Sequence, residues 1–209
     1  MILRDEEQAR AFCAGLTDAA GMARLERLAA MVVEENARQN LVAKTSESAI
    51  WLRHLADSAQ LLVHVSRATS PWLDLGTGAG FPGLVIAALK PELNVILVES
   101  RKKRADWLGR AAGELGLGRC RVEGRRLEHV ATFPAAIISA RAFAPLGKLF
   151  ALSARFSTHD TVWLLPKGRS AVQEVASLPP EVAAMFHVEQ SVTDTEAGIV
   201  IGTGRPRNA

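Results

Sequence analysis

The chain of 209 residues is 48% hydrophobic and 22% charged, which excludes a disordered protein and suits one main domain with an appendage. The net charge of +3 is too small to indicate a partner. Residues 99–128 and 141–170 each carry a net charge of +4, which favours nucleic acid, although ordinary solvated helix faces look similar. No apolar run approaches the roughly 18 residues of a bilayer span and the acidic N-terminus lacks the apolar core of a signal peptide, so we expect a cytoplasmic protein without membrane contact.

The first 70 residues are predicted to be helical. Apolar residues recur at helical spacing from Met22 to Val33 and again from Ile50 to Val63. A polar segment over residues 39–46 connects the two helices, and Ser46 is a candidate N-cap of the second. We therefore expect residues 1–70 to form a helical extension and residues 71–209 to form the main domain.

From residue 71 onward the sequence alternates between short apolar runs and helical patterns. The predicted strands cover residues 72–75, 95–98, 120–122, 136–139 and 161–165, the last stopped by Pro166, and residues 185–192 and 199–202 predict a closing antiparallel pair. Strands that are apolar on both faces and separated by helices indicate a doubly wound, mostly parallel sheet. The predicted fold class is α/β with an N-terminal helical extension. Four tryptophans are expected in the core: Trp51, Trp72, Trp107 and Trp163.

The most informative segment is the glycine-rich loop after the first strand, Asp-Leu-Gly-Thr-Gly-Ala-Gly-Phe-Pro-Gly over residues 74–83. Glycines let the backbone turn sharply and approach a ligand, and in an α/β sheet this crossover lies at the edge where ligands bind. Gly78, Gly80 and Gly83 match the GxGxxG fingerprint of dinucleotide-binding proteins, with Glu99 at about the required distance. A nicotinamide-dependent oxidoreductase is therefore one hypothesis.

The same loop also carries glycines at every second position, preceded by an acid. Asp74, Gly76, Gly78 and Gly80 resemble the S-adenosylmethionine loop of class I methyltransferases, which are Rossmann-like. That resemblance implies glycines near the methionine part of the ligand, with Asp74 bracing the loop or the amino group, and Glu99 accepting hydrogen bonds from the ribose hydroxyls. Only 110 residues follow Glu99, and they complete a single sheet, which favours the methyl donor over a dehydrogenase with a further substrate region.

Several segments together resemble the glucose-inhibited division protein B family, the RsmG-type N7-guanine methyltransferases of bacterial 16S ribosomal RNA. The similar segments are the loop over 74–83, Asn-Leu-Val at 40–42, Arg-His-Leu-Ala-Asp-Ser at 53–58, Glu-Ser-Arg-Lys-Lys-Arg at 99–104, Ser-Ala-Arg-Ala-Phe at 139–143 and Pro-Lys-Gly at 166–168. The resemblance covers about residues 36–203. It implies S-adenosylmethionine as cofactor, the small ribosomal subunit as partner, and cofactor contacts at Gly76, Phe81, Arg126, Leu127 and Arg141.

One position departs from the family pattern, because the family usually has an acid where this chain has Leu127, with Glu128 next. Either backbone groups hold the adenine, or the loop is shifted by one residue. Guanine N7 carries no proton, so its methylation needs no general base, and positioning should supply most of the rate gain. Arg141, at a small apolar strand end, is the candidate catalytic residue, since its guanidinium could stack on or hydrogen-bond a purine.

Each of the remaining polar candidates has two interpretations, a structural one and a functional one. Arg53, His54 and Asp57 lie on one helix, where an Arg53–Asp57 ion pair and a packed imidazole compete with a place at the substrate mouth. Lys167 is either a phosphate contact or a surface lysine. Two cysteines, Cys13 and Cys120, lack CxxC partners and a nearby His cluster, so we expect reduced thiols and no metal. We expect a monomer, and a non-enzymatic RNA-binding protein is the last alternative.

Overall fold

The computed structural model describes residues 2–65 and 69–206. Seven strands form one sheet in the order β3-β2-β1-β4-β5-β7-β6. Their bounds are β1 (Trp72–Leu75), β2 (Val95–Val98), β3 (Cys120–Glu123), β4 (Ile137–Ala140), β5 (Val162–Lys167), β6 (Phe186–Gln190) and β7 (Gly198–Thr203). Strands β1 to β5 pair in parallel, and β7 is antiparallel to both β5 and β6. The predicted parallel sheet with a closing antiparallel pair is confirmed.

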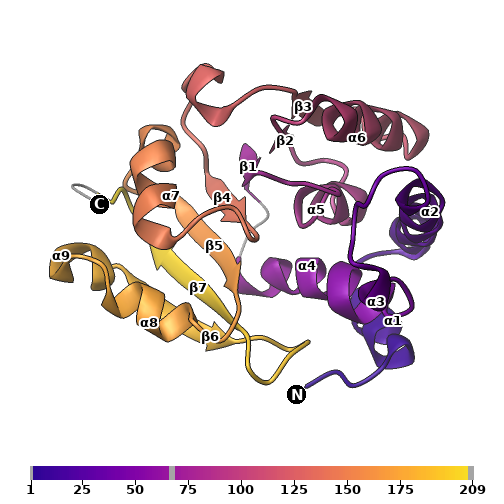
Figure 1. The fold of residues 1–209 in the computed structure, drawn as a ribbon, viewed down its shortest axis with the longest axis horizontal. Coiled ribbons are helices and arrows are strands. Elements are labelled where there is room, and N and C mark those ends of the chain that lie inside the picture. The colour runs from indigo at the N-terminus through magenta and orange to yellow at the C-terminus, as the bar shows by residue number, and fades with distance from the viewer. Residues whose placement is uncertain (1, 66–68, 207–209) are drawn as a thin grey trace.

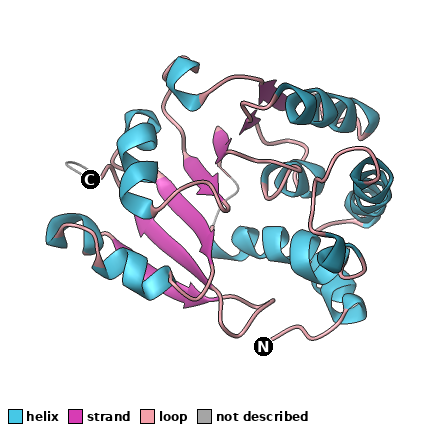
Figure 2. Cartoon of the chain, in the orientation of Figure 1, coloured by secondary structure: helices cyan, strands magenta, loops and turns pink. Residues whose placement is uncertain are grey.

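Helices cover both faces of the sheet (Figures 1 and 2). The described helices are α1 (Glu6–Ala14), α2 (Ala19–Asn36), α3 (Lys44–Glu47), the π-helix η1 (Trp51–Ala56), α4 (Asp57–Ala59), η2 (Gln60–His64), α5 (Gly83–Leu89), α6 (Lys102–Glu114), η3 (Leu127–His129), α7 (Leu146–Ser153), η4 (Ala154–Phe156), α8 (Ala171–Ala176) and α9 (Pro180–Ala183). None of these helices combines the length and the hydropathy that a bilayer span needs.

Alternate residues of the strands point into two separate hydrophobic clusters. Trp72, Val95 and Leu97 face a cluster that contains α1, α2, α5 and α6, whereas Leu73 and Leu75 face a second cluster under α7, α8 and α9. Because side chains alternate along a strand, a sheet covered on both faces needs apolar residues at every position. The N-terminal helices thus share one core with one face of the sheet. All four tryptophans are buried, as expected.

Two local predictions were wrong. Ser46 does not cap the second helical stretch, because it lies inside α3; the carboxylate of Glu6 instead accepts hydrogen bonds from the amides of Trp51 and Leu52, at 3.0 and 2.8 Å. Pro166 does not end β5, which continues to Lys167. The pairing with β4 ends at Leu164, so that side of β5 is an open edge at Pro166, where proline is tolerated.

The close approach of α5 to β1 and β2 gives the first testable prediction. A Cβ atom added to Gly83 would lie 2.2 Å from Leu97 Cδ2 and 2.8 Å from the Asp74 carboxylate. Gly83→Ala should therefore lower the free energy of unfolding by about 1–3 kcal/mol through overpacking. Urea denaturation measures this change. Gly109→Ala is the control, because nothing lies near that position on α6, and it should raise stability by about 0.5–1 kcal/mol. A Gly83 variant as stable as the parent would refute this packing.

Candidate active site

The predicted site residues meet at the edge of the sheet where the parallel strands end. Leu75 of β1 pairs with Val98 of β2 on one side and with Ala140 of β4 on the other. The residues that follow these three positions are Gly76, Glu99 and Arg141. Since neighbouring strands lie about 4.8 Å apart, Glu99 and Arg141 flank the glycine loop from opposite sides. The topology therefore brings together residues that are far apart in the sequence.

A buried carboxylate braces the start of the glycine loop. Asp74 Oδ2 accepts a hydrogen bond from the amide of Gly83 at 3.0 Å, and Oδ1 accepts one from the hydroxyl of Ser139 at 2.7 Å. The Ser139 hydroxyl also receives the indole N–H of Trp72 at 2.9 Å. Burial raises the pKa of Asp74 to about 6, although these hydrogen bonds and Arg141 oppose that rise. Asp74 thus joins β1, β4 and the first turn of α5.

Backbone conformation explains the glycines of the loop. Gly76 and Gly78 have φ angles of +61° and +60°, which side chains disfavour. The amide of Gly78 donates to Glu99 Oε2 at 3.1 Å, and the amide of Arg101 donates to Glu99 Oε1 at 2.8 Å. Glu99 is buried, and these two bonds fix its carboxylate beside the loop. The glycine loop, Glu99 and the start of α6 are thus joined by hydrogen bonds to one carboxylate.

A cavity of about 410 Å³ lies on the Glu99 side of the loop. Its lining includes Gly76, Glu99, Arg126, Leu127 and Glu128. The side chain of Leu127 packs in the hydrophobic core, so backbone groups are what this residue can offer to a ligand. Arg126 and Glu128 are exposed at the rim. The structure thus brings together four of the residues predicted to contact the cofactor.

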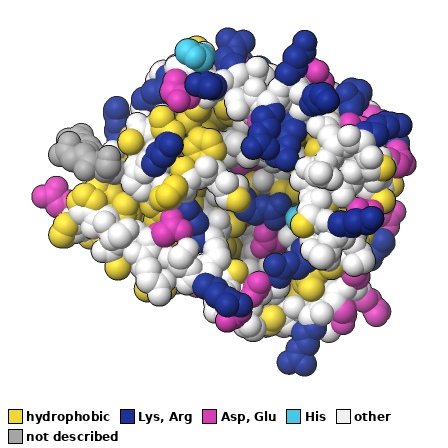
Figure 3. Space-filling model, viewed as in Figure 1, with side chains coloured by type: hydrophobic (Ala, Val, Ile, Leu, Met, Phe, Trp, Pro, Cys, Tyr) yellow, Lys and Arg dark blue, Asp and Glu magenta, His cyan; other side chains and the backbone are white. Residues whose placement is uncertain are grey.

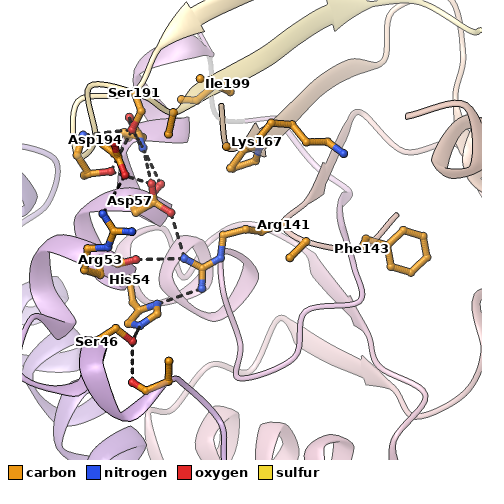
Figure 4. Close-up of a pocket in the computed structure, with 18 of the residues that line it drawn as sticks. Ser46, Arg53, His54, Asp57, Arg141, Phe143, Lys167, Ser191, Asp194 and Ile199 are labelled. Carbon is orange, nitrogen blue, oxygen red and sulfur yellow. Dashed lines mark hydrogen bonds and ion pairs between the residues drawn. The ribbon is translucent and has the colours of Figure 1, made fainter. Parts of the chain in front are cut away.

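A larger cavity of about 850 Å³ lies on the Arg141 side (Figure 4). Helix η1, the turn after β4, the end of β5 and the loop between β6 and β7 all contribute to its lining. The three residues of the turn after β4, Ala142, Phe143 and Ala144, line both cavities. The two cavities therefore meet at this turn.

The turn after β4 has an unusual backbone. Ala142 has a φ angle of +53°, in the left-handed region that non-glycine residues rarely adopt and that costs roughly 1–2 kcal/mol. Figure 4 shows the side chains of Arg141 and Phe143, on either side of Ala142, pointing away from each other. The ring of Phe143 lies against Gly76, where an added Cβ would meet it at 2.4 Å. The strained turn thus sends Arg141 toward the larger cavity and Phe143 toward the glycine loop.

Arg141 joins the strand edge to helices η1 and α4 through three hydrogen bonds. Its Nη1 donates to Asp57 Oδ2 at 3.0 Å and to the carbonyl of Arg53 at 3.2 Å, and its Nη2 lies 3.1 Å from His54 Nδ1. The expected Arg53–Asp57 ion pair is wrong, because Arg53 pairs with Asp194 at 3.0 Å instead. The Asp57 carboxylate is bound by Arg141 and Thr193 instead, so tertiary contacts replace the pair expected within the helix.

The contacts of His54 determine which ring nitrogen carries its proton and whether the ring is charged. A guanidinium can only donate, so Nδ1 must accept the bond from Arg141, which leaves the proton on Nε2. Nε2 then donates to the hydroxyl of Ser46 at 2.9 Å, and that hydroxyl donates to the carbonyl of Ala43 at 2.9 Å. The ring stacks on Phe81 with centroids 5.0 Å apart. Burial, followed by the charges of Arg141 and Arg53, lowers the pKa of His54 to about 3, so the imidazole is neutral.

Lys167 lines the larger cavity but is not a free cation. Its ammonium donates to Glu174 at 2.8 Å and to the carbonyl of Ala144 at 2.9 Å, and its side chain is only 10% exposed. The hypothesis that Lys167 contacts phosphate is therefore replaced by an internal ion pair that ties β5 and α8 to the turn after β4.

Neither of the two cysteines lines one of the two cavities. Cys13 and Cys120 are free, as expected, and burial raises the pKa of each to about 12. Within residues 2–65 and 69–206, no group of three or more His, Cys, Asp or Glu side chains could hold a metal ion.

Sequence reasoning missed the loop between β6 and β7. The loop places Ser191, Thr193 and Asp194 in the wall of the larger cavity. Gln60 accepts from the amide of Val192 at 2.9 Å and donates to the Ser191 hydroxyl at 3.1 Å. Nothing in a short polar segment near the C-terminus indicates contact with a helix near the N-terminus. Phe143 belongs to the motif at residues 139–143, but the sequence does not indicate that its side chain lies between two cavities.

Comparison with known proteins agrees with this geometry. Residues 22–200 match the family described as GidB, rRNA small subunit methyltransferase G. The chain is 58% identical to the ribosomal RNA small subunit methyltransferase G of Erythrobacter litoralis, over 99% of this chain and 100% of that protein. It is 53% identical to the protein of the same name from Sphingopyxis alaskensis, over 98% of this chain and 88% of that one.

Similar solved structures share the fold at low sequence identity. A SAM-dependent methyltransferase from Aquifex aeolicus aligns with a TM-score of 0.59 at 13% identity, covering 76% of this chain and 94% of that one. A point mutant of MtNAS, in complex with S-adenosylmethionine, aligns with a TM-score of 0.56 at 15% identity, covering 96% of this chain and 78% of that one. The sheet is thus that of a class I, Rossmann-like methyltransferase, as predicted.

The low pKa of His54 gives a testable prediction. An unfolded histidine titrates near 6.5, so between about pH 3 and 6.5 the unfolded chain binds more protons than the folded one, and acid removes stability. The neutral imidazole therefore favours folding fully above pH 6.5 and progressively less below it. Between pH 8 and pH 5 the parent should lose about 2 kcal/mol more than His54→Gln, by urea denaturation at each pH. Because all other groups are shared, the difference isolates His54. Equal losses would show that His54 takes up a proton as readily in the folded protein as in the unfolded chain.

Proposed function

The chain belongs to the rRNA small subunit methyltransferase G family, and from that premise we propose how its residues carry out the reaction. It is an S-adenosylmethionine-dependent enzyme that methylates guanine N7 of 16S ribosomal RNA. Family membership sets aside both the nicotinamide-dependent oxidoreductase and the non-enzymatic RNA-binding protein. The observation that carries the proposal is that two cavities meet at the turn after β4, directly beside the glycine loop.

The smaller cavity and the glycine loop are the proposed cofactor site. Gly76 and Gly78 have positive φ angles and no Cβ atoms, and the ring of Phe143 packs against Gly76, so a ligand would approach the backbone of this loop beside that ring. Glu99, held beside Gly78, would accept hydrogen bonds from the ribose hydroxyls. Arg126 and the backbone of Leu127 would border the adenine, with Glu128 as the alternative at the rim. When bound there, S-adenosylmethionine supplies the methyl group.

Arg141 lies on the opposite side of Gly76 from Glu99 and lines the larger cavity, and we propose that the methionine end of the ligand reaches past Gly76 to it. A guanidinium binds a carboxylate through two parallel N–H bonds better than any other side chain. We assign the carboxylate of the methionine part to Arg141, while Phe81, 5.3 Å below the guanidinium, supports it from the loop. Asp74 braces this loop, and its own oxygens are occupied by Gly83 and Ser139.

The larger cavity is the proposed site for the guanosine. A cavity of about 850 Å³ is at the upper end of the range for small-molecule sites and has room for a nucleotide turned out of the RNA. N7 carries no proton, so the enzyme needs to hold its in-plane lone pair in line with the methyl group. A neutral His54 whose Nδ1 is already occupied agrees with a reaction that uses no general base.

The RNA would approach the face on which the cavities open. Figure 3 shows Lys and Arg side chains around the hollow on this face. Exposed cations near the cofactor cavity are Arg101, Arg125, Arg126 and Lys148, and Lys102 and Lys103 continue along α6. These side chains would pair with phosphates, which provide affinity without sequence specificity.

The remaining proposals concern domain organisation, oligomeric state and location in the cell. We take residues 1–70 as a helical extension and residues 71–209 as the methyltransferase domain, with a shared core that makes the extension part of the folded unit. We take the protein to act as a monomer in the cytoplasm, on the small ribosomal subunit.

The cofactor site is tested by calorimetry with S-adenosylhomocysteine. The parent should bind this ligand and should not bind NADH. Glu99→Ala should weaken binding by about 1.5–3 kcal/mol, because a charge-assisted hydrogen bond to the ribose is lost. Glu123→Ala is the matched control, since that carboxylate ends the next strand, β3, outside the cavity, and affinity should not change. Unchanged affinity in a folded Glu99 variant would remove Glu99 from the site.

The proposed RNA face predicts a change in salt dependence. Replacing Lys102, Lys103 and Lys148 by Gln together should reduce the slope of log affinity against log salt by roughly one unit per lost phosphate contact. Filter binding of 16S RNA at several salt concentrations measures the slope. Lys90→Gln, at the far end of α5, should leave it unchanged. An identical slope for the triple variant would show that these lysines are only a solvated surface.

A further inference from the structure

Asp57 is the carboxylate that pairs with Arg141 among the described residues. Both side chains are partly buried, at 18% and 24% exposed, so solvent still reaches the pair. Asp57 is itself held in place, because its Oδ1 accepts from Gln60 Nε2 at 2.9 Å and from the Thr193 hydroxyl at 2.8 Å. One carboxylate therefore joins helix α4, the loop between β6 and β7, and Arg141.

The hydrogen bonds of Arg141 leave one edge of its guanidinium open. Both Nη1 hydrogens are used, by Asp57 and the Arg53 carbonyl, and one Nη2 hydrogen is used by His54. Figure 4 shows these partners together on one side of the guanidinium. Within the described part of the chain, Nε–H and the second Nη2–H have no acceptor. These two donors form the pair with which a guanidinium grips a carboxylate.

We propose that Asp57 is a positioning residue for cofactor recognition: it holds Arg141 by one edge so that the other edge is presented to the carboxylate of the methionine part. This inference rests on the proposed function, in which Arg141 binds that carboxylate. An arginine side chain loses rotamer freedom when it binds a ligand, and a protein that has already fixed the rotamer avoids that loss. Asp57 also lowers the net positive charge that the ligand meets.

The two effects of Asp57 have opposite signs, and the geometry decides between them. Partial exposure screens the charge effect, whereas a bidentate grip depends steeply on orientation. Removing the Asp57 charge without changing its shape should therefore weaken recognition of the ligand carboxylate. It should leave recognition of the adenosine part, on the other side of Gly76, unchanged.

The test compares two ligands by calorimetry: S-adenosylhomocysteine and its decarboxylated analogue, which keeps the amine and lacks the carboxylate. The parent should prefer S-adenosylhomocysteine, and Arg141→Ala should abolish that preference. In Asp57→Asn the preference should fall about three- to tenfold, with the affinity for the decarboxylated analogue unchanged. Thr193→Val, which removes one of the bonds that hold Asp57, should shift the preference in the same direction by less. Asp194→Asn is the matched control, since it breaks the Arg53–Asp194 pair without touching Arg141, and should leave the preference unchanged.

Each other outcome overturns the proposal. Equal weakening of both ligands in Asp57→Asn would mean that Asp57 acts only on the fold, and an unchanged or increased preference would mean that it does not orient Arg141. If Asp57→Asn does not fold, an unchanged preference in Thr193→Val overturns the proposal in its place. A parent that binds both ligands equally would refute the Arg141–carboxylate contact, and a parent that binds neither would refute the cofactor site itself.

Discussion

The buried carboxylate of Asp74 is the interaction on which the site depends. It lies near the end of β1, and it accepts hydrogen bonds from β4 through Ser139 and from α5 through the Gly83 amide. A buried carboxylate without such donors would cost several kcal/mol, so the loop between Asp74 and Gly83 can keep its shape only while all three elements are in register. That register is the one that sets Gly76 between Glu99 and Arg141. The cofactor site is thus a consequence of how the central strands pair.

The positions of the other site residues depend on this edge of the sheet. The chain leaves β4 through a strained residue, Ala142, and the turn formed by Ala142, Phe143 and Ala144 lines both cavities. Arg141 directly precedes this turn. On the side of the larger cavity it is hydrogen-bonded to Arg53, His54 and Asp57. Methylation of N7 needs two adjoining sites, because the guanine and the methyl donor must be held in line with each other and no proton has to be removed. His54 is neutral, and its two ring nitrogens are bound to Arg141 and Ser46; in the proposed reaction it orients Arg141 and takes up no proton.

Much of the fold could be predicted from the sequence, because strands that are buried on both faces appear in it as continuous apolar runs. The strands at 72–75 and 95–98 have the expected bounds, and the glycine loop sits where its spacing indicated. Three of the failures have a common cause: they involve contacts between different secondary-structure elements or loops. Glu6 replaces Ser46 as the cap of η1, Asp194 replaces Asp57 as the partner of Arg53, and Glu174 neutralises Lys167. A local pattern shows which groups need partners, but tertiary packing decides which partner is supplied.

The central claim is that this geometry methylates N7 of a guanine. The most direct measurement uses small ribosomal subunits that lack the modification, incubated with the enzyme and S-adenosylmethionine that is labelled on its methyl group. The RNA is then reduced with borohydride and treated with aniline, which breaks the chain at N7-methylguanosine. The account predicts that one methyl group is incorporated and that the RNA is cleaved at one guanine. Incorporation of label without cleavage would place the methyl group on an exocyclic amine or a hydroxyl, and would contradict a site built without a general base.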